Sequence, residues 1–255
     1  MRVTVTQMRT EEPGFEDDFL ALAEHLKAEE SEMVLLPEMP FHPWLCHDLA
    51  PDGAAWQKAE EDHDRWLKRL DELEVAWVAA SRPATRDRER VNQAFVWQAG
   101  QGSIPAHEKH YLPDKAGFYE ATWYGRGDGR FDVATIGPAR AGFLICSELW
   151  FFQWARAYGQ AGAELLLNPR ASTEKRAEMW LTGGRTAAFS AGAYCLSANR
   201  AGRAGPARMG GPGWIIAPNG EVLGLTSDED PFLTLEIDLE AAQAAKKDYP
   251  LNVAD

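Results

Sequence analysis

The sequence predicts one mixed α/β domain, and three observations lead to this expectation. Short runs rich in β-forming residues alternate with longer segments whose apolar residues recur at helical spacing. Two of the expected strands, 75–81 and 91–98, are hairpin-like neighbours in the chain, which argues against a purely parallel sheet. The 255 residues contain neither an internal repeat nor a linker rich in Pro, Gly and Ser, so we expect a single domain over residues 1–255.

Each element follows from its own pattern. Residues 2–7 (RVTVTQ) are expected to form the first strand, and segment 15–26 has its apolar residues on one helical face. The apolar run 33–36 predicts a short buried strand, and 56–70 a second amphipathic helix. The Gly-rich segment 199–213 is expected to be a loop near the site entrance. Helices are also predicted at 149–161 and 174–191, and strands at 75–81, 91–98, 103–107, 131–135, 139–145, 164–167, 194–198, 214–217, 222–225 and 232–237.

Composition and charge narrow the class of protein. Hydrophobic residues make up 45% and charged residues 25% of the chain, as in a globular protein with a sizeable core. The net charge of −13 disfavours nucleic acid as a partner, and no apolar stretch is long enough to cross a bilayer. The N-terminus, MRVTVTQMRTEEPG, lacks the features of a signal peptide. Three irregularly spaced cysteines (Cys46, Cys146, Cys195) do not form a disulfide framework, so we expect a cytoplasmic location.

Three polar residues stand where predicted strands end. Glu38 follows an apolar run. If it lies in a pocket at the strand end, desolvation would raise its pKa toward the range of a general base. From that segment alone, a surface glutamate in a turn is the simpler explanation. Lys109 could lie over an active site or be solvated. Cys146 ends the most apolar strand and could be a small buried residue or a nucleophile. The helix expected from Leu149 would then favour its thiolate.

Together the three residues make a chemically complete set. A thiol nucleophile needs a base, which Glu38 could supply, and its tetrahedral intermediate needs donors at the oxyanion. Lys109 and the backbone N–H of Ser147 could provide them. None of the six histidines has a context that singles it out as an alternative base.

The order of four segments resembles the carbon–nitrogen hydrolase (nitrilase) superfamily. These segments are LLPEM, HEKHYLPDKAGFYE, GFLICSELWF and LLLNPRAS, and VTVTQ, SANRAG and GPGWIIAPNGEVL extend the resemblance over nearly the whole chain. The stretch KHYLPDKAGFYEATWYGRGD is most similar to N-carbamoylputrescine amidases and related amidases. The resemblance implies a four-layer α-β-β-α sandwich, a homodimer or higher homo-oligomer, and neither a metal nor an organic cofactor.

The resemblance also implies roles for individual residues. Glu38 corresponds to the general base, Lys109 to the cation that stabilises the intermediate, and Cys146 to the nucleophile of a Glu-Lys-Cys triad. Glu120 matches a second family glutamate that orients the substrate and the triad. The implied reaction is hydrolysis of an amide, carbamoyl or ureido C–N bond in a small molecule, with release of ammonia through a thioester acyl-enzyme.

The chain departs from its family after the nucleophile. Ser147 and Glu148 replace an aromatic residue and an aspartate, and Phe152-Gln153 replaces a Pro-Glu pair. Glu148 could do the work of the aspartate with a longer side chain. Leu149 and Trp150 stand where relatives that act on N-carbamoyl amino acids have arginines, so a carboxylate bound in that way is disfavoured. Candidate substrate-binding residues are Trp44, Tyr111, Trp123, Trp150 and Arg170, whereas Trp180 and Trp214 are expected in the core.

Other functions stay open at this point. A nitrilase would use the same triad on a C≡N bond, and an inactive scaffold could retain the fold. Arg170 could restrict the site, bind an anion or face solvent. A metal site in the segment HPWLCHD, with His42 and His47, lacks a distal ligand pair. The arginines of the Gly-rich segment do not follow a phosphate-loop spacing.

Overall fold

The computed structural model describes residues 1–11, 14–204 and 207–253. The strands are β1 (Arg2–Arg9), β2 (Met33–Leu35), β3 (Trp77–Arg86), β4 (Glu89–Gln98), β5 (Gly102–Glu108), β6 (Asp114–Lys115), β7 (Phe118–Tyr119), β8 (Ala134–Ile136), β9 (Ala139–Phe143), β10 (Leu165–Arg170), β11 (Tyr194–Ala204), β12 (Ala207–Met209), β13 (Trp214–Ile216), β14 (Val222–Leu225) and β15 (Phe232–Glu236). The α-helices are α1 (Gly14–Ala28), α2 (Gly53–Leu67), α3 (Glu120–Trp123), α4 (Phe152–Gln160), α5 (Ala177–Ala191) and α6 (Leu239–Ala245). Short 3₁₀ helices are η1 (Leu45–His47), η2 (Leu70–Leu73), η3 (Cys146–Trp150) and η4 (Glu174–Arg176).

The main sheet consists of two halves that meet at one strand. Its strand order is β5-β4-β3-β2-β1-β11-β10-β9-β8. The first residues of β1 pair with β15, and only its last three, Gln7 to Arg9, pair with β11. The strands β1, β2 and β3 run parallel in one half, and β9, β10 and β11 run parallel in the other. Because β1 and β11 are themselves parallel, the carboxyl ends of both sets open toward the same region.

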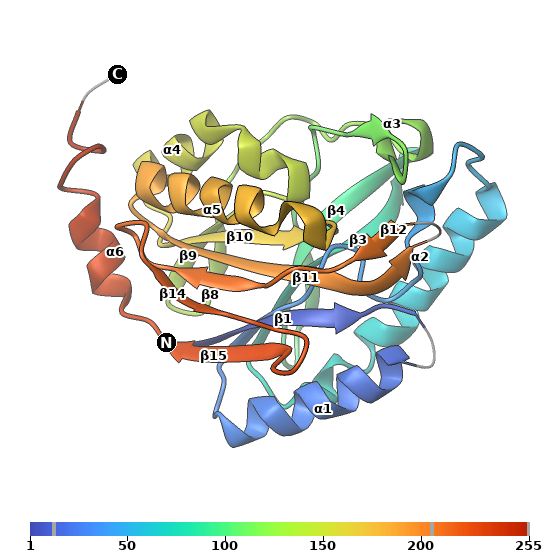
Figure 1. The fold of residues 1–255 in the computed structure, drawn as a ribbon, viewed down its shortest axis with the longest axis horizontal. Helices are drawn as coiled ribbons and strands as arrows, with labels where there is room; N and C mark the ends of the chain where they lie inside the picture. The colour runs from blue at the N-terminus through green and yellow to red at the C-terminus, as the bar shows by residue number, and fades with distance from the viewer. Residues whose placement is uncertain (12–13, 205–206, 254–255) are drawn as a thin grey trace.

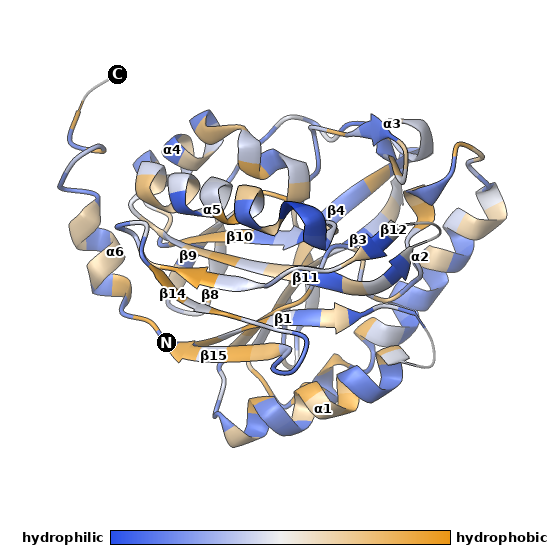
Figure 2. Ribbon diagram, in the orientation of Figure 1, coloured by the Kyte–Doolittle hydropathy of each residue, from blue (hydrophilic) through white to orange (hydrophobic). Residues whose placement is uncertain are grey.

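The halves face each other and carry helices on their outer sides, which makes four layers. In Figure 1, α4 and α5 cover one side of the strands and α1 and α2 the other. Met33 and Leu35 of β2 pack between the half-sheets with Phe143 and Leu167. The residue between them, Val34, packs with α1 instead. Figure 2 shows hydrophilic and hydrophobic residues on opposite sides of α1 and α2, as expected for helices that cover a core. The mixed α/β sandwich expected from the sequence is confirmed.

Some boundaries differ from the expectation. The Gly-rich segment is a loop only in part, because β11 continues to Ala204 and pairs with β12 through Gly202 and Met209, whereas Gly210 to Gly213 lie between β12 and β13; residues 205 and 206 of that segment lie outside the described residues. The strand expected at 131–135 begins only at Ala134. Strand pairing, rather than local propensity, sets these limits. Among the residues that the structure describes, no helix combines the length and apolar character needed to cross a membrane.

Candidate active site

Strand ends bring three of the predicted residues together. Glu38 follows β2, Lys109 follows β5, and Glu120 begins α3, and all three are fully buried. The ammonium of Lys109 donates to Glu38 Oε1 at 2.7 Å and to Glu120 Oε2 at 2.5 Å. Cys146, at the start of η3, is 3% exposed and lines a cavity together with Glu120. A buried cation therefore links two carboxylates beside the thiol.

Two further residues complete this cluster. Asn92 of β4 donates from Nδ2 to Glu38 Oε1 at 2.8 Å, and the Tyr124 hydroxyl donates to Glu120 Oε2. Glu38 Oε2 and Glu120 Oε1 are buried and have no hydrogen-bond partner among the described residues. An unpaired buried acceptor costs about 1–3 kcal/mol, so these are the oxygens open to a proton or to a substrate N–H. Neither Asn92 nor Tyr124 was among the residues expected at the site, although a polar residue inside the apolar strand VNQAFVW was a usable signal for Asn92.

Burial and mutual charge set the protonation of this cluster. Burial would lower the pKa of Lys109, but the carboxylates of Glu120 and Glu38 outweigh it and raise that pKa well above its ordinary value. For Glu120, burial raises the pKa from 4.5 to about 7, against the opposing effect of Lys109. The lysine therefore stays charged, while Glu120 exchanges its proton near neutral pH.

The raised pKa of Glu120 predicts a pH dependence of stability. The folded state binds this proton more tightly than the unfolded state, so the stabilisation is complete below pH 4.5 and is lost as the pH rises to about 7. Denaturant unfolding of the wild type and of Glu120→Gln at about pH 5 and about pH 7.5 measures it. We expect the wild type to lose more stability over this interval than the variant, whereas equal losses would contradict the assignment.

Cys146 lies in a strained turn. Cys146 has φ +46°, in the left-handed region that non-glycine residues rarely adopt, at a cost of about 1–3 kcal/mol. Asn168 of β10 holds the turn by donating from Nδ2 to the carbonyl oxygens of Leu144 and Cys146, at 2.5 and 3.3 Å. The Ser147 hydroxyl donates to the Tyr111 carbonyl at 2.6 Å. The turn thus points the thiol away from the strand and into the cavity.

The expectation that a helix dipole gives a thiolate is wrong for the resting protein. Cys146 is the first residue of the short η3, and the longer helix α4 begins only at Phe152. Burial raises the pKa of the Cys146 thiol, and the Glu38 carboxylate raises it further. The resting thiol is therefore protonated, and its reaction requires a base.

Glu148 connects the turn at Cys146, called the nucleophile turn after the role expected for this residue, to the segment that carries Lys109. Its Oε2 accepts from the backbone N–H of Ile145 and from His107 Nε2, and its Oε1 accepts from the backbone N–H of His110, all at 2.8 Å. The other ring nitrogen of His107 lies 2.9 Å from a backbone carbonyl oxygen. Burial would lower the pKa of His107, but Glu148 raises it above the ordinary value. Glu148 thus holds the buried His107 ring together with two backbone N–H groups, a set of contacts that the sequence did not suggest.

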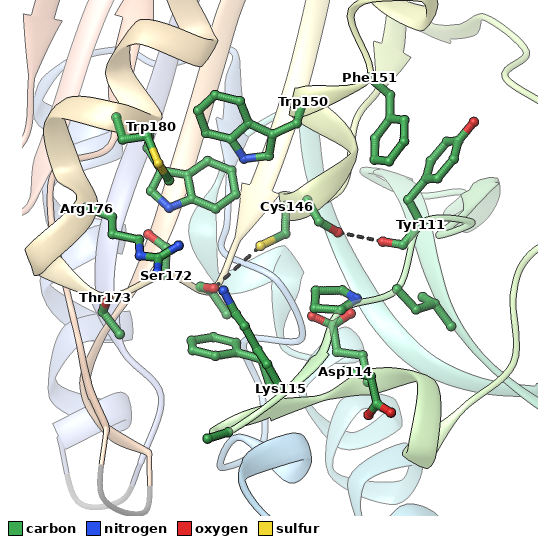
Figure 3. A pocket seen from close by; sticks show the side chains of 18 of the residues that line it. Tyr111, Asp114, Lys115, Cys146, Trp150, Phe151, Ser172, Thr173, Arg176 and Trp180 are labelled. Carbon is green, nitrogen blue, oxygen red and sulfur yellow. Dashed lines mark hydrogen bonds between the residues drawn. The ribbon is translucent and has the colours of Figure 1, made fainter.

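A cavity of about 790 Å³ opens in front of the thiol. Figure 3 shows Trp150 and Trp180 on one side of Cys146 and Tyr111 and Phe151 on the other. The ring centroids of Trp150 and Trp180 are 5.3 Å apart, and Tyr111 stacks on Phe151. The walls near the thiol are therefore aromatic, which suits the apolar part of a small substrate.

Only some of the candidate substrate-binding residues line this cavity. Tyr111 and Trp150 do, and so does Trp180, which also belongs to the buried core, as expected. Trp44 and Trp123 are buried and donate from their indole nitrogens to the carbonyls of Gly117 and Asp48. These two tryptophans pack behind the residues that line the cavity. The expectation that they contact the substrate directly is therefore wrong.

Arg170 is also part of the interior, contrary to the alternatives of an anion site or a solvent-facing side chain. It is fully buried, donates to Ser197 Oγ at 2.9 Å and to Ser172 and Pro212, and its guanidinium carbon lies 4.4 Å from the ring centroid of Trp214. Burial lowers the pKa of Arg170 to about 9. With its donors used inside the protein, Arg170 supports Ser172, which does line the cavity.

Arg200 has a structural role that the sequence did not suggest. It is buried and donates to the carbonyl oxygens of Glu38, Met39 and His42, at 3.1, 2.5 and 2.8 Å. It therefore fixes the turn that carries the expected base. His42 itself pairs with Asp62 at 2.8 Å, and within the described residues no cluster of His, Cys, Asp and Glu could hold a metal ion.

Comparison with known proteins decides the family. The family model described as Carbon-nitrogen hydrolase matches residues 2–247. The chain belongs to the carbon-nitrogen hydrolase family. The resemblance noted in the sequence is thereby confirmed, and the buried Glu-Lys cluster and the thiol lie within the matched region of this carbon-nitrogen hydrolase.

Relatives and solved structures agree with this assignment. An N-carbamoylputrescine amidase of Arabidopsis thaliana is 24% identical over 247 residues, covering 89% of this chain and 82% of the relative. A carbon-nitrogen hydrolase of Helicobacter pylori G27 superposes with a TM-score of 0.84 at 22% identity, over 99% of this chain and 94% of that chain. A mutant amidase of Nesterenkonia sp. AN1, described as carrying the acetamide moiety of fluoroacetamide on its active site cysteine, gives 0.76 at 19% identity, over 96% and 92%. At such identities the structures establish the shared fold.

Proposed function

We propose that this carbon-nitrogen hydrolase cleaves the C–N bond of a small amide, carbamoyl or ureido compound and releases ammonia through a thioester on Cys146. The observation that carries the proposal is the buried Lys109 ammonium, which contacts Glu38 and Glu120 beside a thiol at the base of a cavity. The related N-carbamoylputrescine amidases and the adduct on the cysteine of the Nesterenkonia amidase support it.

The first half of the reaction forms the acyl-enzyme. Glu38 takes the thiol proton through its unpaired Oε2 while Cys146 Sγ attacks the carbonyl carbon. The oxygen becomes an oxyanion, which the Lys109 ammonium and the Ser147 N–H stabilise, because the first N–H groups of a helix have no acceptor within it. The protonated Glu38 then gives its proton to the leaving nitrogen, the C–N bond breaks, and ammonia departs from the thioester.

The second half returns the enzyme to its starting state. Glu38 removes a proton from water as the water oxygen attacks the thioester carbon, and Lys109 again faces the oxyanion. The C–S bond breaks, the acid leaves, and the thiolate recovers its proton from Glu38. Glu120 lines the cavity with an unpaired Oε1, which can accept a substrate N–H and hold the scissile group against Cys146.

Intact-protein mass spectrometry tests the proposal. We expect the protein mixed with short amides to gain the mass of the acyl group on Cys146 and to release ammonia, while the matched Cys146→Ala variant gains nothing. A parallel assay with nitriles distinguishes cleavage of a C≡N bond from cleavage of an amide C–N bond. It compares the amount of ammonia released with the amount of amide formed. Ammonia release by Cys146→Ala at the wild-type rate would refute the proposed nucleophile.

A further inference from the structure

The polar groups behind the cavity form a closed ring of hydrogen bonds. The Lys109 ammonium joins Glu38 Oε1 to Glu120 Oε2, at 2.7 and 2.5 Å. On the opposite side, Asn92 Nδ2 donates to Glu38 Oε1 at 2.8 Å and to the Tyr124 hydroxyl oxygen at 3.4 Å. That hydroxyl donates its one proton to Glu120 Oε2, which closes the ring. The two carboxyls are therefore joined by one charged bridge and by one neutral bridge, made of Asn92 and Tyr124.

Backbone hydrogen bonds keep the neutral bridge in place. Tyr124 directly follows α3, and its N–H donates to the Glu120 carbonyl at 3.0 Å. The next residue, Gly125, donates to the carbonyl of Arg90 on β4 at 2.9 Å, two residues before Asn92 in the chain. The Tyr124 side chain is buried. The hydroxyl therefore reaches Glu120 and Asn92 from a fixed position on the backbone.

Both donors to the Glu120 side chain reach the same oxygen. Lys109 and the Tyr124 hydroxyl each donate to Oε2, whereas Oε1 is buried and has no hydrogen-bond partner among the described residues. A proton that Glu120 takes up therefore goes to Oε1. Glu120 lines the cavity, so its ionised form offers Oε1 to a substrate N–H as an acceptor, while the protonated form places an O–H donor there. The charge state of Glu120 thus controls how the site receives an amide.

We propose that Tyr124 is a positioning residue, whose hydroxyl keeps Glu120 ionised and leaves its Oε1 free to accept the substrate N–H. The inference rests on the proposed function and adds the group that sets the lower pH limit of substrate binding. Neither Tyr124 nor Asn92 is among the described residues that line the cavity, so the neutral bridge acts through the two carboxyls without touching the substrate.

The other buried titratable groups around Glu120 keep their protons at neutral pH. Burial and nearby carboxylates raise the pKa of the Tyr124 hydroxyl and of the Cys46 and Cys146 thiols. For Lys109, burial would lower the pKa, but the carboxylates raise it. A change of protonation near pH 7 therefore belongs to Glu120 or to the other carboxyl of the ring, and substitution of Glu120 distinguishes the two. The segments beside α3 keep four more titratable groups at least partly exposed: His47, Asp48, Asp114 and Lys115.

The pH profile of Tyr124→Phe tests the proposal, because phenylalanine keeps the aromatic ring and removes only the hydroxyl. Burial raises the pKa of Glu120 to about 7, and the hydrogen bonds from Lys109 and Tyr124 oppose that rise. Without the second bond the pKa should rise by about one unit, because a hydrogen bond to a charged group is usually worth at least that much. We expect the acid limb of kcat/KM, which reports ionisation of the free enzyme, to move from about pH 7 to about pH 8.

The size of the effect should depend on pH. At about pH 6, kcat/KM of Tyr124→Phe should lie about tenfold below the wild type, and near pH 9 the two should agree within about twofold. The matched control is Tyr249→Phe, which removes the hydroxyl of a tyrosine that is 66% exposed and lies after α6. We expect this control to keep the wild-type profile. An unchanged acid limb in Tyr124→Phe, or a loss by the same factor at every pH as from a structural defect, would overturn the inference.

Denaturant unfolding decides the inference even if no amide is cleaved. The Tyr124 hydroxyl bonds the ionised carboxyl more strongly than the neutral one, so Tyr124→Phe should cost more stability at about pH 8.5 than at about pH 5.5, by about tenfold in the unfolding equilibrium constant. In the Glu120→Gln background its cost should be the same at both pH values. A cost that does not grow with pH, or that grows equally in both backgrounds, refutes the inference. The absence of both ammonia release and an acyl adduct refutes the proposed function alone.

Discussion

Lys109→Met is expected to lower kcat by about a hundredfold to a thousandfold or more, the usual effect of losing one oxyanion donor. The substitution also leaves Glu38 and Glu120 buried without their shared cation, which typically costs about 3–5 kcal/mol of stability. One of the two carboxyls must then stay protonated at neutral pH. Steady-state ammonia release and denaturant unfolding measure the two effects.

The matched control is Lys175→Met, which removes an exposed lysine outside the cavity. We expect it to retain wild-type kcat and stability. Lys109→Arg should not restore activity, because a planar guanidinium does not fit a site built around a compact ammonium that contacts two carboxylates. A Lys109→Met protein that folds and turns over at the wild-type rate would contradict the role given to this residue.

Glu148→Ala is expected to have the second largest effect. It leaves the buried His107 ring without its partner and two buried backbone N–H groups without their acceptor, so we expect a loss of about 3–5 kcal/mol in stability. Because a displacement of about 1 Å at the reacting groups can reduce a rate by about a hundredfold, kcat should fall while KM changes little. Thermal unfolding and steady-state kinetics measure both quantities.

Conservative changes sharpen this second prediction. Glu148→Asp keeps the charge but shortens the reach, so it should recover part of the stability and less of kcat. Glu178→Ala, an exposed glutamate on α5, is the control and should behave like the wild type. If Glu148→Ala retained full kcat, the link between the nucleophile turn and the lysine segment would have no bearing on catalysis.

Local sequence patterns were informative where they mark the end of a strand. Apolar runs that stop at Glu38 and Cys146 mark strand ends, and parallel strands that end at one edge bring their next residues together. The end of a predicted strand also marked Lys109, and the order of the family segments supplied Glu120. The four-layer arrangement followed from the same resemblance.

The features that the sequence did not predict depend on contacts between residues that are far apart in the chain. The partners of Glu148 and Glu38 are His107 and Asn92, which lie 41 and 54 residues away and carry no local mark of their contact. Trp44 and Arg170 are close to the site in sequence, but which face of the wall they occupy is set by packing. The strand β11 extends through glycines and arginines because β12 pairs with it, a contact that propensity does not reveal.

The proposed site combines residues from both half-sheets, so it forms only when the two halves are in place. Glu38 and Lys109 come from one half and Cys146 from the other, and the strands that complete the second half, β11, β13 and β14, are made after the nucleophile. Arg200, which reaches across to the carbonyl of Glu38, is also made late. A growing chain on the ribosome therefore carries the Cys146 thiol before Glu38 and Lys109 are held in their final positions relative to it. On the proposed function, we expect amide cleavage to begin only after the last third of the chain has folded.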